Sequence, residues 1–215
     1  MNHSIHGKKY NEIADRIERE LEVEKHIENW DLDKYLNSTT FRIYDEKIIE
    51  KLLENITDGL KEYERYKKII NERRTSHWFP IYKYEYEAIY YAVSIFEKER
   101  EILNKIKAKT SFEMVENYTN KLYKIDSLYR KFYESYDEIV DKDRFVTLTE
   151  KVENFYNNYF LNELSVKWSK LVEDELLDDF TVEDMPHQKD FYKEFVSHFV
   201  QDNERIFVIV SDALR

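Results

Sequence analysis

Residues 205–215, RIFVIVSDALR, differ in character from everything that precedes them in the chain. Five apolar residues follow one another without a break at positions 206–210, and four of the five are β-branched. A short, continuous apolar run of this kind is typical of a strand buried on both faces of a parallel sheet. Ser211 and Asp212 come directly after the run, at the end of a strand where α/β folds place their chemistry. The stretch therefore predicts one strand, and Asp212 is the most site-like residue of the sequence.

A single parallel strand cannot form a sheet by itself. We therefore expect residues 206–210 to find no strand partner inside the chain, which would leave a bare edge able to pair with another chain. The chain is interpreted as an internal piece of a longer protein, in which the sheet would be completed.

The remainder of the sequence predicts long helices with an aromatic core. The 215 residues include 18 Tyr, 13 Phe and 3 Trp, but only two Gly and two Pro. Average domains use several times more Gly and Pro, which supply turns. The predicted fold class is mainly α: a multi-helix array of long aromatic-rich helices, ending in one orphan strand that would start an α/β catalytic domain.

Apolar residues recurring at three- and four-residue spacing mark the individual helices. The predicted helices cover residues 8–29, 45–56, 60–74, 80–107, 110–136, 147–171 and 189–201. In the first of them we expect the stripe Tyr10, Ile13, Ile17 and Leu21 to be the packed face.

Helix starts are predicted from capping residues. Pro80 suits the first turn of a helix, and Asp45 is a plausible N-cap. Thr110 and Thr147 are each followed three residues later by a glutamate, which is the spacing of a capping box.

An acidic stretch predicts the domain boundary. No basic residue occurs between Lys170 and Lys189, while seven acidic residues accumulate there and Pro186 closes the stretch. We divide the chain into a helical domain at 1–173, an acidic linker at 174–188, and a helix and first strand at 189–215.

Charge and composition exclude several function classes. A net charge of −11 argues against a general nucleic-acid or anionic-membrane surface, although it leaves a local basic patch open. No apolar run approaches the roughly 18 residues of a membrane span, and the N-terminus has no signal-peptide core. With no cysteine in the sequence, a cytoplasmic protein without disulfides is expected.

Most familiar catalytic motifs are missing from the sequence. There is no Gly-rich phosphate loop, no Gly-x-Ser-x-Gly elbow and no His-Glu-x-x-His. The tyrosine stripes are more typical of core than of base-stacking surfaces, with a protein interface as an intermediate interpretation. Asp212 is the remaining candidate for a functional residue, because a carboxylate at a strand end is a suitable ligand for a divalent cation. The alternative interpretation is a plain strand-capping aspartate.

The closing motif carries a family resemblance. Residues 207–215, FVIVSDALR, resemble the opening motif of the PglZ domain, a branch of the alkaline-phosphatase superfamily. The preceding helices resemble the helical region of PglZ type A, a protein of BREX phage-defence systems. The residues that carry this second similarity are Trp78, 86–88, Ala92, 125–126, 129–133, 155–156, 159–164, Trp168 and 190–192.

The resemblance implies a function for the longer protein rather than for this chain. It implies a metal-dependent phosphatase or phosphodiesterase, with zinc as the expected metal and Asp212 as its first ligand. The nucleophile and the other ligands would lie beyond residue 215, so we expect this chain alone to be inactive and to bind no metal stably. Other BREX proteins are the implied partners; nucleic acid is possible for the full complex but not expected for this chain.

Two alternatives remain open. The chain could be a stand-alone helical adaptor whose last strand only imitates the motif. It could also bind single-stranded nucleic acid through its tyrosine-rich helices, which predicts salt-sensitive binding.

Overall fold

The computed structural model describes residues 5–176, 181–182, 185 and 187–209. Within these ranges the chain forms twelve α-helices with short π- and 3₁₀-helical segments, and no strand. The mainly α, multi-helix fold class is therefore confirmed. None of the described helices is both long enough and apolar enough to cross a membrane.

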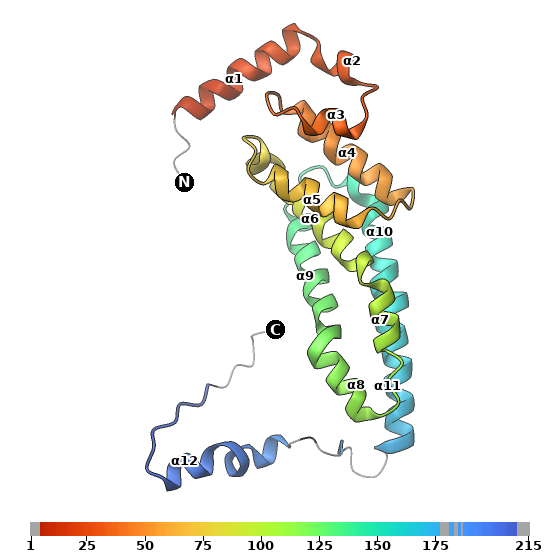
Figure 1. Cartoon of the computed structure of the whole chain (residues 1–215), viewed down its shortest axis with the longest axis vertical. Coiled ribbons are helices and arrows are strands. Elements are labelled where there is room, and N and C mark those ends of the chain that lie inside the picture. Colours follow the sequence, from red (N-terminus) through yellow and green to blue (C-terminus); the bar gives the residue numbers. More distant parts are fainter. Residues whose placement is uncertain (1–4, 177–180, 183–184, 186, 210–215) are drawn as a thin grey trace.

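Three antiparallel helical rods form the elongated body of the molecule (Figure 1). Two of the rods contain a π-helical segment that joins two α-helices without a break. The rods are α6 (Phe79–Glu97) with α7 (Glu99–Lys105); α8 (Ser111–Asn117), η1 (Tyr118–Leu122) and α9 (Tyr123–Asp137); and α10 (Val146–Asn154), η3 (Phe155–Leu161) and α11 (Asn162–Glu175).

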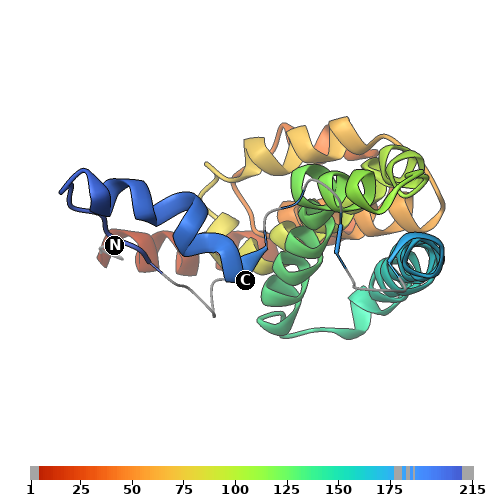
Figure 2. The same cartoon turned by 90° about the horizontal axis from the view of Figure 1, so that it is seen from below.

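Shorter helices pack on one end of these rods. Helices α4 (Ile43–Thr57) and α5 (Tyr63–Arg73) lie against α6, and α3 (Leu32–Leu36) lies against α4. Helices α1 (Ile5–Glu20) and α2 (Val23–Ile27) lie farther out at the same end (Figure 1), and the view from below shows α1, in red, projecting to one side of the rods (Figure 2).

One hydrophobic cluster runs through the body from Ala14 to Leu171, and its core is as aromatic as the composition predicts. The largest fully buried side chains include Trp78, Tyr86, Phe132 and others from every rod. Burial of each such side chain stabilises the fold by about 1.5–3 kcal/mol relative to exposure, so packing rather than helix propensity holds the rods together.

The first helix packs on a different face from the one we expected. Ile13 is 50% exposed and Leu21 is 57% exposed, whereas Ala14 is buried. The small Ala14 side chain allows close approach to the body, and a carboxylate oxygen of Glu18 accepts the backbone N–H of Ile43 at 3.4 Å. Ile13 and Leu21 of the predicted stripe are therefore left exposed, whereas Tyr10 packs against His77 and Trp78.

The predicted helix over 8–29 is also interrupted. Glu22 adopts a left-handed backbone conformation with φ 46°, which no α-helix can contain. The chain consequently breaks into α1 and α2 at this residue.

The expected helix starts have mixed outcomes. Thr110 is confirmed, because its hydroxyl accepts the backbone N–H of Glu113 at 3.2 Å, and Pro80 lies in the first turn of α6 as predicted. Thr147 is not a cap: α10 begins at Val146, directly after the 3₁₀ turn η2 (Asp143–Phe145). Asp45 is not a cap either, since α4 begins at Ile43 and places Asp45 in the core.

The last described segment contains η4 (Gln188–Asp190), η5 (Tyr192–Val196) and α12 (Ser197–Gln201), which corresponds to the helix predicted at 189–201. It runs away from the three rods in Figure 1. Residues 204–209 lie outside helices and strands, so the expected strand is not formed there. A strand acquires its ladder only from a partner, and none of the described residues supplies one.

Candidate functional site

Asp212, the metal ligand suggested by the sequence, lies outside the described residues, as do Val210 and Ser211. Just before them, Phe207 is 87% exposed and Ile209 is 90% exposed. Within the part of the chain that the structure describes, no three His, Asp or Glu side chains gather in a group that could hold a metal ion. The helices that the structure describes therefore offer no metal centre of their own.

Polar side chains of the described helices form a tyrosine–carboxylate cluster between the second and third rods. Its first centre is Asp126 on α9. The hydroxyl of Tyr118 donates to one carboxylate oxygen at 2.6 Å, and the hydroxyl of Tyr156 donates to the other at 2.7 Å. Tyr118 comes from η1 and Tyr156 from η3, so both π-helical segments direct a phenol to the same carboxylate. Such segments are frequent at functional sites because they re-aim side chains.

The second centre of the cluster is Glu153 on α10. One of its carboxylate oxygens accepts the hydroxyl of Tyr129 at 2.7 Å and also that of Tyr133, while the other accepts the side-chain amide of Asn157 at 2.5 Å. The ring of Tyr129 stacks on Tyr156 with centroids 3.7 Å apart, which links the two centres.

The environment keeps these phenols protonated. Burial, followed by the hydrogen bond to Glu153, raises the pKa of Tyr129 to about 12. Burial and the same carboxylate also raise the pKa of Tyr133. Burial opposes ionisation of Glu153, but the donated hydrogen bonds from Tyr133, Tyr129 and Asn157 outweigh it and lower its pKa. At neutral pH the tyrosines are therefore donors and Glu153 is an acceptor with its donors already in place. This arrangement joins helices and leaves no group ready to act as a nucleophile or base.

Removing the Glu153 carboxylate tests this role. We expect Glu153→Ala to lower the free energy of unfolding by about 1–3 kcal/mol, because two half-buried phenols lose their acceptor. Because folding lowers the pKa of Glu153, its carboxylate contributes to stability at pH values above the ordinary pKa of a glutamate. This contribution is lost as the pH falls through the lowered pKa of the folded protein. Urea unfolding at pH 7 and at pH 3 measures both effects.

Glu150→Ala is the matched control, because Glu150 lies one turn earlier on the same helix and is exposed. The control should change stability by less than about 0.5 kcal/mol. Equal losses in the two variants would contradict the assigned role.

Another polar site, separate from the tyrosine–carboxylate cluster, is fully buried between α4, α5 and α6. Arg73 donates from Nε to one oxygen of Asp45 at 2.9 Å and from Nη2 to the other, and the hydroxyl of Tyr86 donates to Asp45 at 2.6 Å. Arg73 also donates to the carbonyl oxygen of Ser38 at 3.0 Å. Burial, followed by the charge of Asp45, raises the pKa of Tyr86 well above its usual value. Because the Asp45 carboxylate, the Arg73 guanidinium and the Tyr86 hydroxyl all have hydrogen-bonding partners, we assign this centre a structural role.

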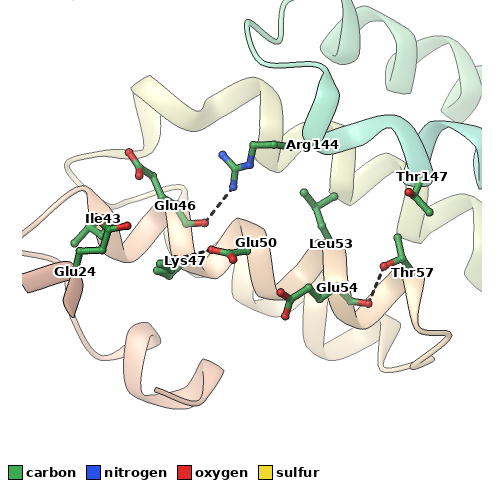
Figure 3. A pocket seen from close by; sticks show the side chains of 10 residues that line it. All are labelled: Glu24, Ile43, Glu46, Lys47, Glu50, Leu53, Glu54, Thr57, Arg144 and Thr147. Carbon is green, nitrogen blue, oxygen red and sulfur yellow. Dashed lines mark hydrogen bonds and ion pairs between the residues drawn. The ribbon is translucent and has the colours of Figure 1, made fainter. Parts of the chain in front are cut away.

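An open groove with a volume of about 490 Å³ lies between α4 and the start of α10, with α2 at its side (Figure 3). Its charged lining consists of Glu24, Glu46, Glu50, Glu54, Lys47 and Arg144. Lys47 pairs with Glu50 at 2.9 Å, and Arg144 donates to the backbone carbonyl of Glu46 at 3.4 Å. Lys47 is therefore paired with a carboxylate inside the groove, whereas Arg144 takes part in no ion pair among the described residues.

Sequence patterns did not reveal these centres, although Asp45 left one signal. It lies four residues before Ile49 and therefore falls on the apolar face of its own helix. Asp126, Tyr129, Tyr133 and Tyr156 were noted only as residues that carry a family resemblance, and the fold brings all four together.

The comparisons with known proteins find two similar proteins, and both are called alkaline-phosphatase-like. It is 39% identical over all of its 215 residues to "Alkaline phosphatase-like protein PglZ" of Bacillus cereus (strain H3081.97). It is 28% identical over 96% of its length to "Alkaline phosphatase-like protein BrxZ" of Escherichia coli O9:H4 (strain HS). These matches confirm the resemblance to PglZ.

The chain spans about a quarter of the length of each of these relatives, 25% in both cases. No protein-family profile matches the chain. No solved structure matches it either.

Proposed function

We propose that this chain is the helical region of a PglZ-type, metal-dependent phosphoric-ester hydrolase, together with the first strand of its catalytic domain. The observation that carries the proposal is the 39% identity to a PglZ protein across the entire chain, including the closing motif. The relatives are described as alkaline-phosphatase-like, which supports metal dependence in a protein of their full length.

In this proposal the described helices have a mechanical role. The rods form a stiff body held by one aromatic core and by the tyrosine–carboxylate cluster, and they set the distance between the parts of the longer protein. They also present acidic and aromatic surface to other components of a BREX phage-defence complex in the cytoplasm. The domain division at 1–173, 174–188 and 189–215 belongs to the same proposal.

Asp212 supplies one ligand of the metal site in this proposal. A divalent cation, zinc by family resemblance, would polarise the phosphoryl oxygen when it is bound. This chain would contribute the Asp212 carboxylate to hold the cation, and the segment 206–210 would fix that carboxylate at the end of a buried strand. The remaining ligands and the nucleophile would come from other parts of the longer protein.

Metal removal tests the proposed activity. A protein of the relatives' full length that contains this chain should hydrolyse p-nitrophenyl phosphate or bis(p-nitrophenyl) phosphate. EDTA should abolish turnover, and zinc or manganese should restore it. Turnover that survives EDTA, or none with any divalent metal, would contradict the proposal. Turnover by residues 1–215 alone would contradict the role assigned to the helices, and a full-length protein inactive with every metal would favour the adaptor.

A further inference from the structure

The first helix carries an apolar stripe that is largely exposed. It consists of Tyr10, Ile13 and Ile17 on α1 and of Leu21, which directly follows α1 and donates its backbone N–H to the carbonyl of Ile17 at 2.9 Å. These four side chains are 36–57% exposed. Their spacings of three and four residues place them along one side of the helix, and we call them the α1 stripe.

α1 is held to the body mainly by side chains outside this stripe. Ala14 is buried, Asp15 pairs with Arg42 at 3.4 Å, and Nε2 of His77 donates to the side-chain oxygen of Asn11 at 2.6 Å. A helix of a globular protein normally buries its apolar stripe against the core. Here small and polar side chains make most of the contact with the body, so the stripe is available to another surface.

Charge along the outer edge of the α1 stripe changes sign from one end to the other. Lys9, Arg16 and Glu20 lie along this edge, because their spacings of seven and four residues keep them on one side of the helix. All three are exposed. Lys9 takes part in no ion pair among the described residues, and Glu20 has only Arg16 as a partner there, at 3.9 Å. The edge is therefore basic at its N-terminal end and acidic at its C-terminal end.

We propose that the α1 stripe is the interface of a homodimer, in which α1 of a second copy packs antiparallel to the first. A two-fold axis near residue 15 places Ile13 of each copy against Ile17 of the other. Equivalent edges meet in an antiparallel pair, so the same register brings Lys9 of each copy close to Glu20 of the other. Parallel pairing would instead place like charges together at both ends.

The charges of α1 favour a second copy over a membrane or a nucleic acid. The helix contains four basic and four acidic residues. Helices that lie on anionic membranes have a polar face rich in Lys and Arg, and phosphate backbones need clustered cations. α1 also projects to one side of the rods, which leaves room for a second molecule (Figure 2). This interface is separate from the proposed phosphoesterase activity and does not depend on it.

Concentration-dependent association tests the dimer. The interface uses about six residues from each copy, whereas a standard interface uses roughly 20–30, so we expect weak association with a Kd on the order of 100 µM. Sedimentation equilibrium of the 215-residue chain between about 10 and 500 µM should show dimer increasing with concentration. A chain that stays monomeric at the highest concentration would overturn the proposal, including the case in which another part of a longer protein covers the stripe.

Matched variants locate the interface. Ile13→Asp should weaken dimerisation at least tenfold, because each copy then buries a carboxylate in the apolar contact. Phe207→Asp is the control: Phe207 is 87% exposed and belongs to the other exposed apolar stretch of the chain, and its replacement should leave dimerisation unchanged. Circular dichroism verifies that both variants are folded. Equal losses in the two variants, or a loss in Phe207→Asp alone, would overturn the location.

Disulfide formation tests the orientation, because the chain has no cysteine of its own. Ile13→Cys protein is mixed with Ile17→Cys protein that carries a larger tag, and the mixture is oxidised. Antiparallel packing predicts mainly the mixed disulfide, since equivalent positions are offset by about 6 Å along the axis. Homodisulfides in excess over the mixed product would show parallel packing and overturn the proposed arrangement.

Charge exchange tests the register. Lys9→Glu and Glu20→Lys should each weaken dimerisation roughly fivefold, because each change turns two attractive contacts per dimer into repulsive ones. The double variant Lys9→Glu/Glu20→Lys restores opposite charges at both ends, and its Kd should return to within about twofold of the original. A double variant that is no better than the single ones would overturn the pairing of Lys9 with Glu20.

Discussion

Replacing Asp45 with alanine is expected to lower the free energy of unfolding by about 3–5 kcal/mol, a large share of the stability of a domain of this size. The variant leaves the Arg73 guanidinium buried without its carboxylate, and Tyr86 loses the acceptor of its hydroxyl. The cost is that of an uncompensated buried charge, and it exceeds the net value of the ion pair itself. Urea unfolding followed by circular dichroism measures this loss of free energy of unfolding.

A surface ion pair supplies the control. Asp33→Ala removes one of the two carboxylate partners of Arg65, whose Nη2 lies 2.7 Å from an oxygen of the 75% exposed Asp33 side chain; Glu62 remains as the other partner at 2.7 Å. Solvent screens this pair, so the loss should stay below about 1 kcal/mol. The double variant Asp45→Leu/Arg73→Met should recover much of the stability lost in Asp45→Ala, because it leaves no unpaired buried charge. A loss below about 1 kcal/mol in Asp45→Ala would contradict the burial of this centre.

The second large effect concerns activity. In a protein of the relatives' full length, Asp212→Ala is expected to lower kcat for phosphoester hydrolysis by at least about a hundredfold. Loss of a residue that only supports a ligand costs 10–100-fold in metal affinity or activity, so loss of a ligand itself should cost no less. The measurement is metal-dependent turnover, together with the bound metal content determined by elemental analysis.

Asp202→Ala serves as the control for this variant, because Asp202 is an exposed aspartate shortly before the same segment. It should retain full turnover and metal content. An Asp212→Ala protein with unchanged activity would remove this residue from the site, and loss of activity without loss of metal would assign it a role other than metal binding.

Local sequence signals were reliable where they depend on backbone chemistry. Pro80 and Thr110 start helices as predicted, because a missing N–H or a side-chain acceptor acts within a single turn. Thr147 has the same spacing pattern but lies inside α10, since the preceding 3₁₀ turn already starts the helix. A cap signal therefore competes with whatever structure precedes it.

The faces of the helices were harder to predict. Periodicity identifies an apolar stripe, but it does not say whether a neighbour covers it. Ile13 and Leu21, from the stripe of the predicted first helix, remain exposed. Conversely, we expected Asp45 to cap its helix rather than to be buried, because carboxylates are rarely buried unless they are paired. Its partner Arg73 is 28 residues away, on another helix.

The closing stretch 205–215 shows what sequence can and cannot predict: its motif resembles PglZ, but the strand that it predicts is not formed at its described residues 205–209. By itself the sequence determined the mainly helical character, the aromatic core and the resemblance to PglZ, because composition, periodicity and a short motif are local properties. The tertiary structure alone decided that two π-helical segments direct tyrosines to Asp126 and that Asp45 meets Arg73. Such contacts join residues from different helices, and their distances are set by the packing of the rods.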